Sequence, residues 1–489
     1  MSGKDPRLER LADAVLLPCF DGTSAPEWVR RRVAGSLAGV CLFARNVADV
    51  DQVAALSAEL AAERESVVIS VDEEAGDVTR LDAATGSRFP GAAALGRVDD
   101  PALTERIAEQ VGDVLVRAGV SANFAPCADV AVDPSNPVIG SRAFGSDTDL
   151  VARHTVAWVT GQQRAGVAAS TKHFPGHGDT AADSHRSAAV LHADRDTLWA
   201  QAIPPFREAV RAGTASIMAG HLLAPAVDDL PASVSRRWLT EILRGELGFD
   251  GAIVTDALEM AAVAGPYGIA GAAVRALAAG ADLLCLGGDT RPPEEIDSYR
   301  DAIVEAVRRG HLAEERLADA AARCETLGLA AARRLGPAPS GIAPADGGTP
   351  FDDAASREAS ARALQVAGGL PALRDPVLVV RCADPGNIAI GAIPWGPAPL
   401  LAAREILVGD GDVPSEGAIR AAATVLVVTR DRHRHPWMRA IVDGVRRIRP
   451  DAVLVEMGIS GVSGDDGPAI ASYGATLANA RAVVESLRG

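Results

Sequence analysis

The stretch AGVAASTKHFPGHGDTAADSH, residues Ala165–His185, joins an apolar run to a dense group of titratable side chains. Its first part, Ala165–Thr171, is small and apolar, which predicts a buried β-strand. The remainder, Lys172–His185, carries one lysine, three histidines and two aspartates. Pro175 and Gly176 prevent that part from continuing as a helix. Titratable groups gathered where a strand ends are typical of an active site, so we expect one here.

Apolar runs of the same kind recur on both sides of this strand, and helix-like stretches such as 53–60 and 103–111 lie between most of them. Short strands that alternate with helices predict an α/β fold. The runs number eight, which favours a (β/α)8 TIM barrel. A doubly wound sheet gives a similar alternation and stays an alternative on this pattern. The runs are 14–20, 39–44, 67–72, 121–126, 166–173, 216–221, 252–256 and 281–286.

Several of these runs end in a polar residue. In a TIM barrel the carboxyl ends of the strands form the active-site face, so such residues are candidates for function. The polar residues at the predicted strand ends are Asp72, Asn123, His173, His221 and Asp256.

The composition changes after the predicted barrel. Helix-like sequence continues from Glu294 to about Arg334, and a Pro/Gly-rich stretch, 336–355, then predicts a linker. We expect a barrel domain over 1–335 and a smaller α/β domain over 356–489. The strands predicted for the smaller domain are 376–380, 424–428 and 452–455, and its predicted helices are 418–423, 438–447 and 480–487.

The composition also narrows the class of protein. The chain has 489 residues, 48% hydrophobic and 23% charged, which is ordinary for a soluble globular protein. Its net charge of −16 argues against binding to nucleic acid or anionic membranes, because like charges repel. We find neither a signal peptide nor a run of about 18 apolar residues that would predict a membrane span. Four of the six cysteines lie in or beside apolar runs without a Cys-x-x-Cys pair, so we expect buried free thiols and a cytoplasmic location.

The loop matches three common site patterns only in part. His173 and His177 are four residues apart, as zinc ligands on a helix are, but a proline and a glycine intervene. A phosphate cradle at Gly176–Gly178 lacks the lysine and the serine or threonine that normally follow. A serine hydrolase needs a Gly-x-Ser-x-Gly elbow, and Gly458–Gly461 matches it out of register. All three patterns are therefore disfavoured.

Two other features fit acid/base and nucleophilic chemistry better. Asp183 and His185 are two residues apart, so in an extended segment their side chains point the same way. A carboxylate beside an imidazole makes a dyad that moves a proton near neutral pH; the alternative is a solvated surface turn. Asp256 ends an apolar run, where it can serve as a nucleophile or a metal ligand, or alternatively as the N-cap of the next helix.

Together these motifs resemble the family-3 glycoside hydrolases, in particular the bacterial β-N-acetylglucosaminidases of that family with an Asp-His acid/base dyad. The similarity rests on Lys172–Thr180, on Asp183–His185 and on Val254–Met260. It covers about residues 10–335 and implies a TIM barrel, and the C-terminal part looks like the α/β sandwich domain that some members append. Supporting stretches are 123–126, 140–145 and 245–251.

The resemblance implies a role for each matching residue. Asp256 matches the catalytic nucleophile, and His185, paired with Asp183, matches the general acid/base. A retaining mechanism needs such a nucleophile and a separate group that first donates and then accepts a proton. The resemblance implies no metal and no organic cofactor. The positions that hold the hydroxyls or the N-acetyl group of the terminal sugar are matched by Asp72, Arg80, Arg142, Lys172 and His173.

The chain departs from the family pattern after the third predicted strand. Members often read Asp-Gln-Glu-Gly-Gly-Arg-Val there, and this chain has Asp77 where the arginine is common. A β-glucosidase of broader specificity therefore stays an alternative to strict N-acetylglucosamine selectivity. Some relatives with the dyad resemble phosphorylases. A histidine repels an incoming phosphate less than a carboxylate does, so the dyad is compatible with phosphate as the acceptor. A phosphorylase that uses phosphate as the acceptor is thus the second alternative.

The leading expectation is a cytoplasmic, exo-acting, retaining β-N-acetylglucosaminidase of carbohydrate metabolism. We expect it to hydrolyse cell-wall disaccharides, as in peptidoglycan recycling, or chitin fragments. Its expected partner is a small-molecule glycoside, with no nucleic acid and no membrane. The basic run Arg432–Trp437 of the second domain is either a solvated turn or a binding edge.

Overall fold

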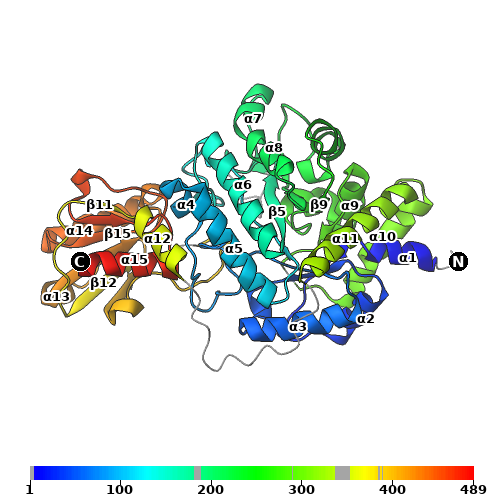
Figure 1. Ribbon diagram of the computed structural model, residues 1–489. Helices are drawn as coiled ribbons and strands as arrows, with labels where there is room; N and C mark the ends of the chain where they lie inside the picture. The colour runs from blue at the N-terminus through cyan, green and yellow to red at the C-terminus, as the bar shows by residue number, and fades with distance from the viewer. Residues whose placement is uncertain (1–4, 181–188, 289, 336–352, 384–385, 388) are drawn as a thin grey trace. The chain divides into compact units, whose positions relative to one another are not determined.

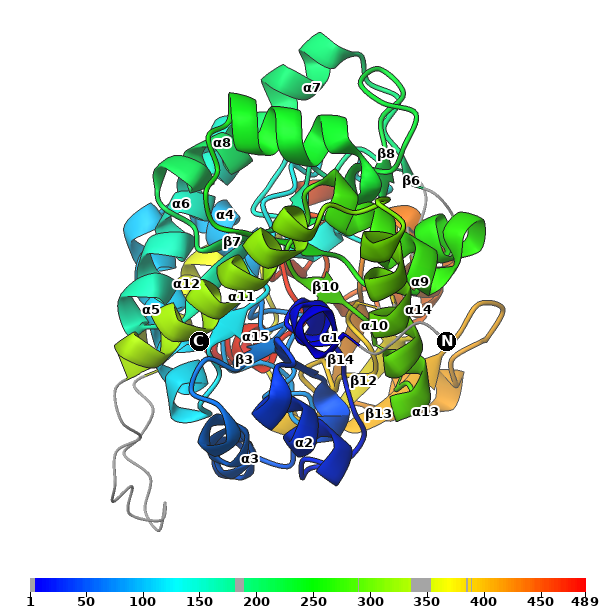
Figure 2. The same ribbon diagram turned by 90° about the vertical axis from the view of Figure 1, so that its right-hand side faces the viewer.

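The computed structural model describes residues 5–180, 189–288, 290–335, 353–383, 386–387 and 389–489 (Figures 1 and 2). Within these residues, every strand predicted for the first part of the chain is present and overlaps the apolar run that predicted it. These strands are β1 (Leu16–Leu17), β2 (Gly39–Leu42), β3 (Val68–Val71), β4 (Ala122–Asn123), β5 (Ala168–Phe174), β7 (Ser216–Ala219), β9 (Ala252–Thr255) and β10 (Leu284–Cys285).

The strands form a curled parallel sheet whose order follows the chain. β2, β3, β4, β5, β7 and β9 are hydrogen-bonded neighbours in that order, and each pair is parallel. β10 pairs with β1 and reaches β9 through a parallel bridge between Val254 and Leu283. A doubly wound sheet reverses its strand order at a switch point, so the observed order excludes that alternative.

One apolar cluster receives a side chain from each of these strands or from the residue just before it. Helix α11 adds Cys324 and Leu327 to the same cluster. The inner face of the curled sheet is therefore filled, and polar groups that act on a ligand must stand at its rim. The buried members are Leu17, Ala38, Cys41, Val68, Ala122, Phe124, Ala168, Met218, Ala252, Val254, Leu283, Cys324 and Leu327.

Helices connect the strands and cover the outer face of the sheet. α6 and α8 pack against β5 and against each other (Figure 1), while α1 packs against α10 and α11 (Figure 2). The stretches predicted as helical at 53–60 and 103–111 lie in α3 and α5. The helices of this part are α1 (Pro6–Asp13), α2 (Glu27–Gly35), α3 (Val50–Glu63), α4 (Ala92–Val98), α5 (Pro101–Arg117), α6 (Thr148–Ala165), α7 (Arg195–Gln201), α8 (Ile203–Arg211), α9 (Ala261–Ala279), α10 (Pro293–Arg308) and α11 (Glu314–Leu335), with the shorter or wider turns η1 (Ala44–Asn46), η2 (Gly140–Arg142), η3 (Ala232–Val234) and η4 (Arg237–Glu246).

Local signals set the entry into β5. The Asp147 carboxylate caps the start of α6 by accepting a hydrogen bond from the Leu150 amide. At the other end of this helix, Gly166 has a φ of 115°, a left-handed conformation that glycine adopts without strain. The chain can therefore turn sharply at Gly166 and enter the buried strand that leads to the loop.

Helix α9 corrects one expectation from the sequence. By length and composition alone it is apolar enough to cross a membrane, although no such stretch was expected. A single helix of this kind is weak evidence, because core helices of soluble proteins have the same character. α9 also contains Pro266 and a non-helical Gly268, and it packs against α10, α11 and η3.

The described part of the chain divides into two compact units that are not consecutive in sequence. The stretches that follow β3 and β4, which include Arg80 and Arg142, belong to the second unit. The predicted linker falls mostly on 336–352, outside the described residues, so the predicted boundaries stay a prediction. The first unit is Met1–Glu73, Thr104–Ile139 and Ser146–Thr349, and the second is Glu74–Leu103, Gly140–Gly145 and Pro350–Gly489.

The second unit contains a sheet whose described strands run in the order β11-β16-β15-β14-β12-β13. The neighbours are parallel except for β11, which is antiparallel to β16. The three predicted strands are β12, β14 and β15, and they lie side by side in its middle. The elements are β11 (Gln365–Ala367), β12 (Val377–Cys382), β13 (Arg404–Val408), β14 (Thr424–Thr429), β15 (Val453–Glu456), β16 (Ala469–Ala471), α12 (Ala354–Ala363), α13 (Glu416–Ala421), α14 (Pro436–Ile448), α15 (Leu477–Arg488), η5 (Pro399–Leu401), η6 (Arg432–Arg434) and η7 (Gly464–Asp466).

Both faces of this second sheet are buried. Val425 and Val427 of β14 join one apolar cluster, which also contains Met438 of α14. Leu426, which lies between them in the strand, joins another cluster, which contains Val483 of α15. Helices therefore cover both faces, and the central strands are continuous apolar runs, as parallel strands buried on both sides usually are.

The six cysteines are all buried and free, which confirms the expectation of buried free thiols. Burial raises the pKa of the Cys19 and Cys382 thiols to about 12. These thiols are uncharged at neutral pH and hence poor nucleophiles.

Candidate active site

The carboxyl ends of β5, β7 and β9 stand at one edge of the first sheet, because the three strands are parallel neighbours. Lys172 and His173 lie at the end of β5, His221 shortly after β7, and Asp256 directly after β9. The backbone packs closely there, since a Cβ on Gly220 would lie 3.2 Å from the His173 Cβ. The predicted strand-end groups are therefore brought to a common rim.

Lys172 and Asp72 form an ion pair within the first unit. The Lys172 Nζ lies 2.5 Å from Oδ1 of Asp72, and the two side chains are 2% and 19% exposed. Their strands, β5 and β3, are separated by β4, so the pair spans a neighbouring strand. A buried ammonium is expensive without a close anion, so Asp72 allows Lys172 to stay charged inside the rim.

Asp129, in the segment after β4, holds the beginning of the loop. This segment runs beside the end of β5, where the Ala128 amide donates to the Lys172 carbonyl at 2.6 Å. The Asp129 carboxylate is fully buried and receives four donors. Oδ1 accepts from the amides of His173 and His177 at 3.3 and 2.6 Å. Oδ2 accepts from Nδ1 of His173 at 2.7 Å and from the Cys127 thiol at 3.0 Å.

These donors keep Asp129 ionised. Burial opposes ionisation, but the electrostatic and hydrogen-bond interactions with His173 and His177 outweigh it and lower the pKa of Asp129. The carboxylate therefore stays an acceptor across the physiological pH range. Nδ1 of His173, which faces it, must carry a hydrogen.

The middle of the loop is seated on the segment after β4 as well. His177 is buried, and Thr180 and Asn136 bind its ring and its carbonyl at 2.8 Å each. A Cβ on Gly178 would lie 1.7 Å from the Val130 carbonyl oxygen, so only glycine fits at this position. The loop thus has a fixed path up to Thr180.

The predicted acid/base pair, Asp183 and His185, lies outside the described residues. The chain on either side of it is described. On one side the hydrogen bonds of His177 hold the loop up to Thr180. On the other side β6 (Ala189–Val190) pairs in parallel with β8 (Leu222–Leu223), which follows His221. The described chain on each side of 181–188 is therefore anchored by hydrogen bonds.

Asp256 follows β9 directly and is partly exposed. Its amide donates to the Ala219 carbonyl, and its Oδ1 accepts from the Ala257 amide at 2.8 Å. The next helix, α9, has Met260 as its N-cap. The alternative prediction, in which Asp256 caps that helix, is therefore wrong. A strand-end carboxylate that serves no helix cap fits the predicted role at the rim.

His221 holds the residue that follows Asp256. Its Nε2 lies 2.9 Å from the Ala257 carbonyl oxygen, and its Nδ1 lies 2.6 Å from the Ser233 hydroxyl. A carbonyl oxygen only accepts, so Nε2 carries the hydrogen. This buried imidazole links the end of β7 to the end of β9 and steadies the backbone at Asp256.

Glu259 links the end of β9 to the end of β10. Its Oε1 accepts from the Gly288 amide at 2.5 Å, and a Cβ on Gly287 would lie 1.7 Å from its carboxylate. Burial raises the pKa of Glu259, and the nearby charge of Asp256 acts in the same direction. The protonation of Glu259 is therefore coupled to the predicted nucleophile.

The two predicted sugar-binding arginines are engaged inside the second unit. Arg142 makes a bidentate pair with Glu74, at 2.9 and 2.7 Å, and both side chains are buried. Nη2 of Arg80 donates to the Ala389 carbonyl at 3.0 Å. The structure thus places the five predicted residues in two groups, Asp72, Lys172 and His173 in the first unit and Arg80 and Arg142 in the second.

Among the described residues, one group of side chains could also hold a metal ion. Ligand atoms of Cys127, Asp129 and His173 lie within 4.8 Å of one another. The thiol and the imidazole both donate hydrogen bonds to Asp129, so the carboxylate is already satisfied without an ion. Soft thiolate and imidazole ligands would suit zinc, which would have to displace both hydrogens.

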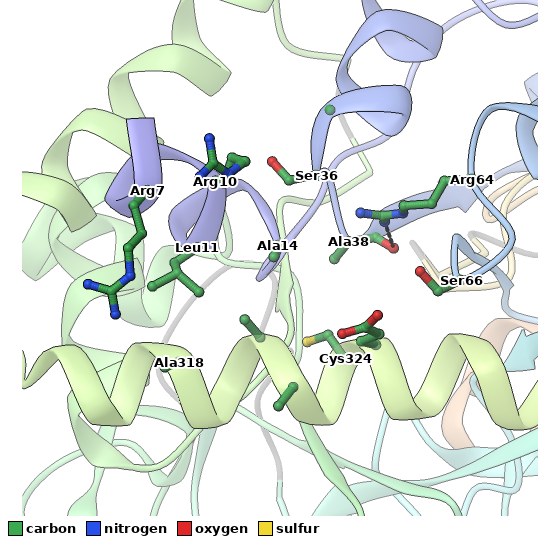
Figure 3. A pocket seen from close by; sticks show the side chains of 14 residues that line it. Arg7, Arg10, Leu11, Ala14, Ser36, Ala38, Arg64, Ser66, Ala318 and Cys324 are labelled. Atoms are coloured by element: carbon green, nitrogen blue, oxygen red, sulfur yellow. Dashed lines mark hydrogen bonds between the residues drawn. The ribbon is translucent and has the colours of Figure 1, made fainter. Parts of the chain in front are cut away.

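A hollow of about 350 Å³ lies at the opposite ends of the strands (Figure 3). Ala14, Ala38 and Ser66, which line it, stand just before β1, β2 and β3. Arg64 also lines it and donates to the Ala38 carbonyl at 3.2 Å. Barrel enzymes work at the carboxyl ends of their strands, so this hollow is not the candidate active site.

Residues 23–327, which include this rim, match the family model described as "Glycosyl hydrolase family 3 N terminal domain". The protein is a glycoside hydrolase. More narrowly, the chain belongs to glycoside hydrolase family 3, which confirms the resemblance drawn from the motifs.

Curated relatives carry related names. "Beta-hexosaminidase" of Thiobacillus denitrificans is 40% identical over 304 residues, which are 60% of this chain and 83% of that protein. "Beta-hexosaminidase A" of Pseudoalteromonas piscicida is 32% identical over 316 residues, and the match spans only 53% of its length. The match to these relatives spans about 60% of this chain.

Solved structures extend the similarity over the whole chain. A family-3 β-N-acetylglucosaminidase from Paenibacillus sp. str. FPU-7 is 31% identical, with a TM-score of 0.87, and the match covers 99% of this chain and 96% of that one. A "Beta-glucoside phosphorylase" covers 100% of this chain with a TM-score of 0.76 and 92% of its own length. At 20% identity that second likeness shows the fold alone.

Proposed function

We propose that this protein is a retaining, exo-acting β-N-acetylglucosaminidase that releases terminal N-acetylglucosamine by hydrolysis. The observation that carries the proposal is the common rim, where Lys172, His173 and Asp256 stand at the carboxyl ends of β5 and β9. The names of the relatives and the similar acetylglucosaminidase structure support the same activity.

The reaction proceeds in two steps. Asp256 attacks the anomeric carbon of the terminal sugar and forms a covalent bond to it, while His185 gives a proton to the departing oxygen. Water then attacks the same carbon, His185 takes the proton of that water, and Asp256 leaves. Asp183 orients His185 in both steps, and inversion twice at one carbon gives retention.

Lys172 and His173 hold the sugar against Asp256. The Lys172 ammonium is a charged donor, which binds hydroxyl and carbonyl oxygens strongly, and His173 stands beside it at the end of β5. The family resemblance also gives Arg80 and Arg142 a role in sugar binding, and inside the second unit Glu74 orients the Arg142 guanidinium.

At finer detail, we propose that the first sheet closes as a (β/α)8 barrel and that the second unit is an α/β sandwich domain. The pairing of β10 with β1 and the shared apolar cluster support closure. Helices on both faces of the second sheet support the sandwich.

The substrates we propose are small glycosides from the cell wall or from chitin. The location we propose is the cytoplasm, because six buried free thiols suit a reducing compartment.

A product assay tests the function. The purified protein is given 4-nitrophenyl β-glycosides of N-acetylglucosamine and of glucose, with phosphate absent or at millimolar concentration. We expect free N-acetylglucosamine in both conditions, appearing first as the β-anomer by NMR. Sugar 1-phosphate as the main product would make the protein a phosphorylase, and equal rates on both sugars would make it a broader β-glucosidase. The Asp256→Ala variant is the blank.

A further inference from the structure

Asp129 is assigned by neither the sequence motifs nor the family roles. It is fully buried, stands on the segment after β4, and its backbone neighbour Ala128 is hydrogen-bonded to Lys172. A single carboxylate there collects donors from three residues, Cys127, His173 and His177. Two of these three stand at the end of β5 and in the loop that follows it, so the buried acid is tied to the candidate active site.

The first oxygen, Oδ1, fixes the turn that leaves β5. It accepts from the amides of His173 and His177, four residues apart, and so closes the turn between them. Inside this turn the Gly176 amide donates to the His173 carbonyl at 2.7 Å. Oδ1 therefore acts together with this backbone hydrogen bond to fix the direction in which the chain leaves the strand.

The second oxygen, Oδ2, fixes the imidazole of His173. A carboxylate only accepts, and Nδ1 lies 2.7 Å away, so the ring hydrogen is held on Nδ1. In a neutral ring Nε2 is then an acceptor. The carboxylate thus decides both the orientation of the ring and the chemistry that Nε2 offers to a ligand.

We propose that Asp129 is a positioning residue, which sets the tautomer of His173 and the path of the loop so that His173 receives the terminal sugar. The activity readout rests on the proposed function, whereas the tautomer readout does not.

The Asp129→Asn substitution distinguishes the role of Oδ1 from the role of Oδ2. In this variant the side-chain oxygen still accepts from the two backbone N–H groups. The side-chain NH2 group cannot face them, because it is itself a donor. The NH2 group then faces Nδ1 of His173, which must become an acceptor, so that the hydrogen moves to Nε2. The substitution keeps the shape of the site and reverses the hydrogen-bonding character of Nε2.

The experiment measures the tautomer of His173 by nitrogen NMR and the kinetics on an aryl N-acetyl-β-glucosaminide. The chain has 9 histidines, and His173→Gln identifies the signal. We expect the Nδ1–H form in the wild type and the Nε2–H form in Asp129→Asn. We also expect kcat/KM to fall by about 10–100-fold, mainly through KM, as for other partners that orient a functional histidine.

Thr104→Val is the matched control. The Thr104 hydroxyl lies 2.8 Å from the ring Nδ1 of another buried histidine, His154. This contact joins α5 to α6. Its loss should lower stability without changing KM, which separates a structural effect from positioning.

An Nε2–H tautomer of His173 in the wild type overturns the proposal, and that measurement needs no variant to fold. Wild-type kinetics in a folded Asp129→Asn variant overturn it as well. If the wild type shows no glycosidase activity but has the expected tautomer shift, the proposed function fails while the Asp129–His173 relationship stands.

Discussion

The Arg430 guanidinium lies 2.8 Å from Oδ2 of Asp77, and the two side chains are 7% and 3% exposed. Asp77 also accepts from the Ser141 hydroxyl and from the Ala475 amide, all within the second unit. Asp77 stands where family members often have an arginine. In this protein an arginine that follows β14 pairs with that position, so the departure from the family pattern is part of a buried ion pair.

The first prediction concerns this pair. Asp77→Asn or Arg430→Met should each lower the free energy of unfolding by about 3–5 kcal/mol, because each leaves a buried charge without its partner. Urea denaturation measures the change. The exposed pair Arg420–Glu416, with 63% and 61% exposure, is the control, and its disruption should cost about 0.5 kcal/mol or less. Equal costs for the two pairs would show that Asp77 and Arg430 are not held together as described.

Lys172 and Asp72 should respond unequally to substitution. Asp72→Ala leaves the ammonium of Lys172 buried at 2% exposure, and we expect a loss of about 3–5 kcal/mol. Lys172→Met should cost less stability, since the Asp72 carboxylate at 19% exposure can bind water. Chemical denaturation of both variants checks the order. The reverse order would contradict the burial of Lys172.

Asp256→Ala should lose turnover by several orders of magnitude and keep its fold, because the nucleophile is removed from a partly exposed rim. Mass spectrometry of the wild type, quenched during turnover of a slow substrate, should find sugar attached to the peptide that contains Asp256. Ordinary turnover in the variant, or sugar on a different peptide, refutes the assignment.

His185→Ala should harm natural disaccharides more than nitrophenyl glycosides. A nitrophenolate is a good leaving group and needs little help from an acid, so its glycosylation rate survives better. The comparison uses kcat/KM for both substrate types. His192→Ala, on an exposed residue nearby in the chain, is the control. Equal losses for both substrates would argue against an acid role.

Glu259 should make stability depend on pH in a defined direction. Burial raises its pKa above the ordinary 4.5, and its Oε2 has no hydrogen-bond partner among the described residues. Between the unfolded and the folded pKa the folded state binds more protons, so stability falls as pH rises through that window.

Glu259→Gln should flatten that fall, which urea denaturation from pH 4 upward can measure. The variant should gain stability relative to the wild type as pH rises above about 4.5 and show no such gain below it. Glu485→Gln, at an exposed glutamate, is the control and should leave the slope unchanged. An unchanged slope in Glu259→Gln would mean that Glu259 ionises normally.

Burial explains which strands could be predicted. β14 and β15 are buried on both faces, so they appear as continuous apolar runs. β13 is largely exposed, and β11 is exposed at Val366, so neither produced such a run. The strand order of the first sheet needed the structure, because a barrel and a doubly wound sheet alternate alike in sequence.

The candidate site was predicted unevenly for a similar reason. Lys172, His173 and Asp256 stand at strand ends, which can be located from the apolar runs. Asp129 had a weaker signal, an aspartate between Ala128 and Val130, which indicates a buried acid but not its partners. Two of those partners, His173 and His177, come from β5 and its loop, some forty residues away in the chain, and only folding brings them to Asp129.

The pairing of β1 with β10 has a practical side. The family match begins at residue 23, beyond β1. The amides of Leu284 and Leu286 donate to the carbonyls of Val15 and Leu17. A recombinant fragment trimmed to the matched residues would expose that edge to solvent and to other chains, which favours aggregation. Shortened versions of this enzyme should therefore begin ahead of Val15.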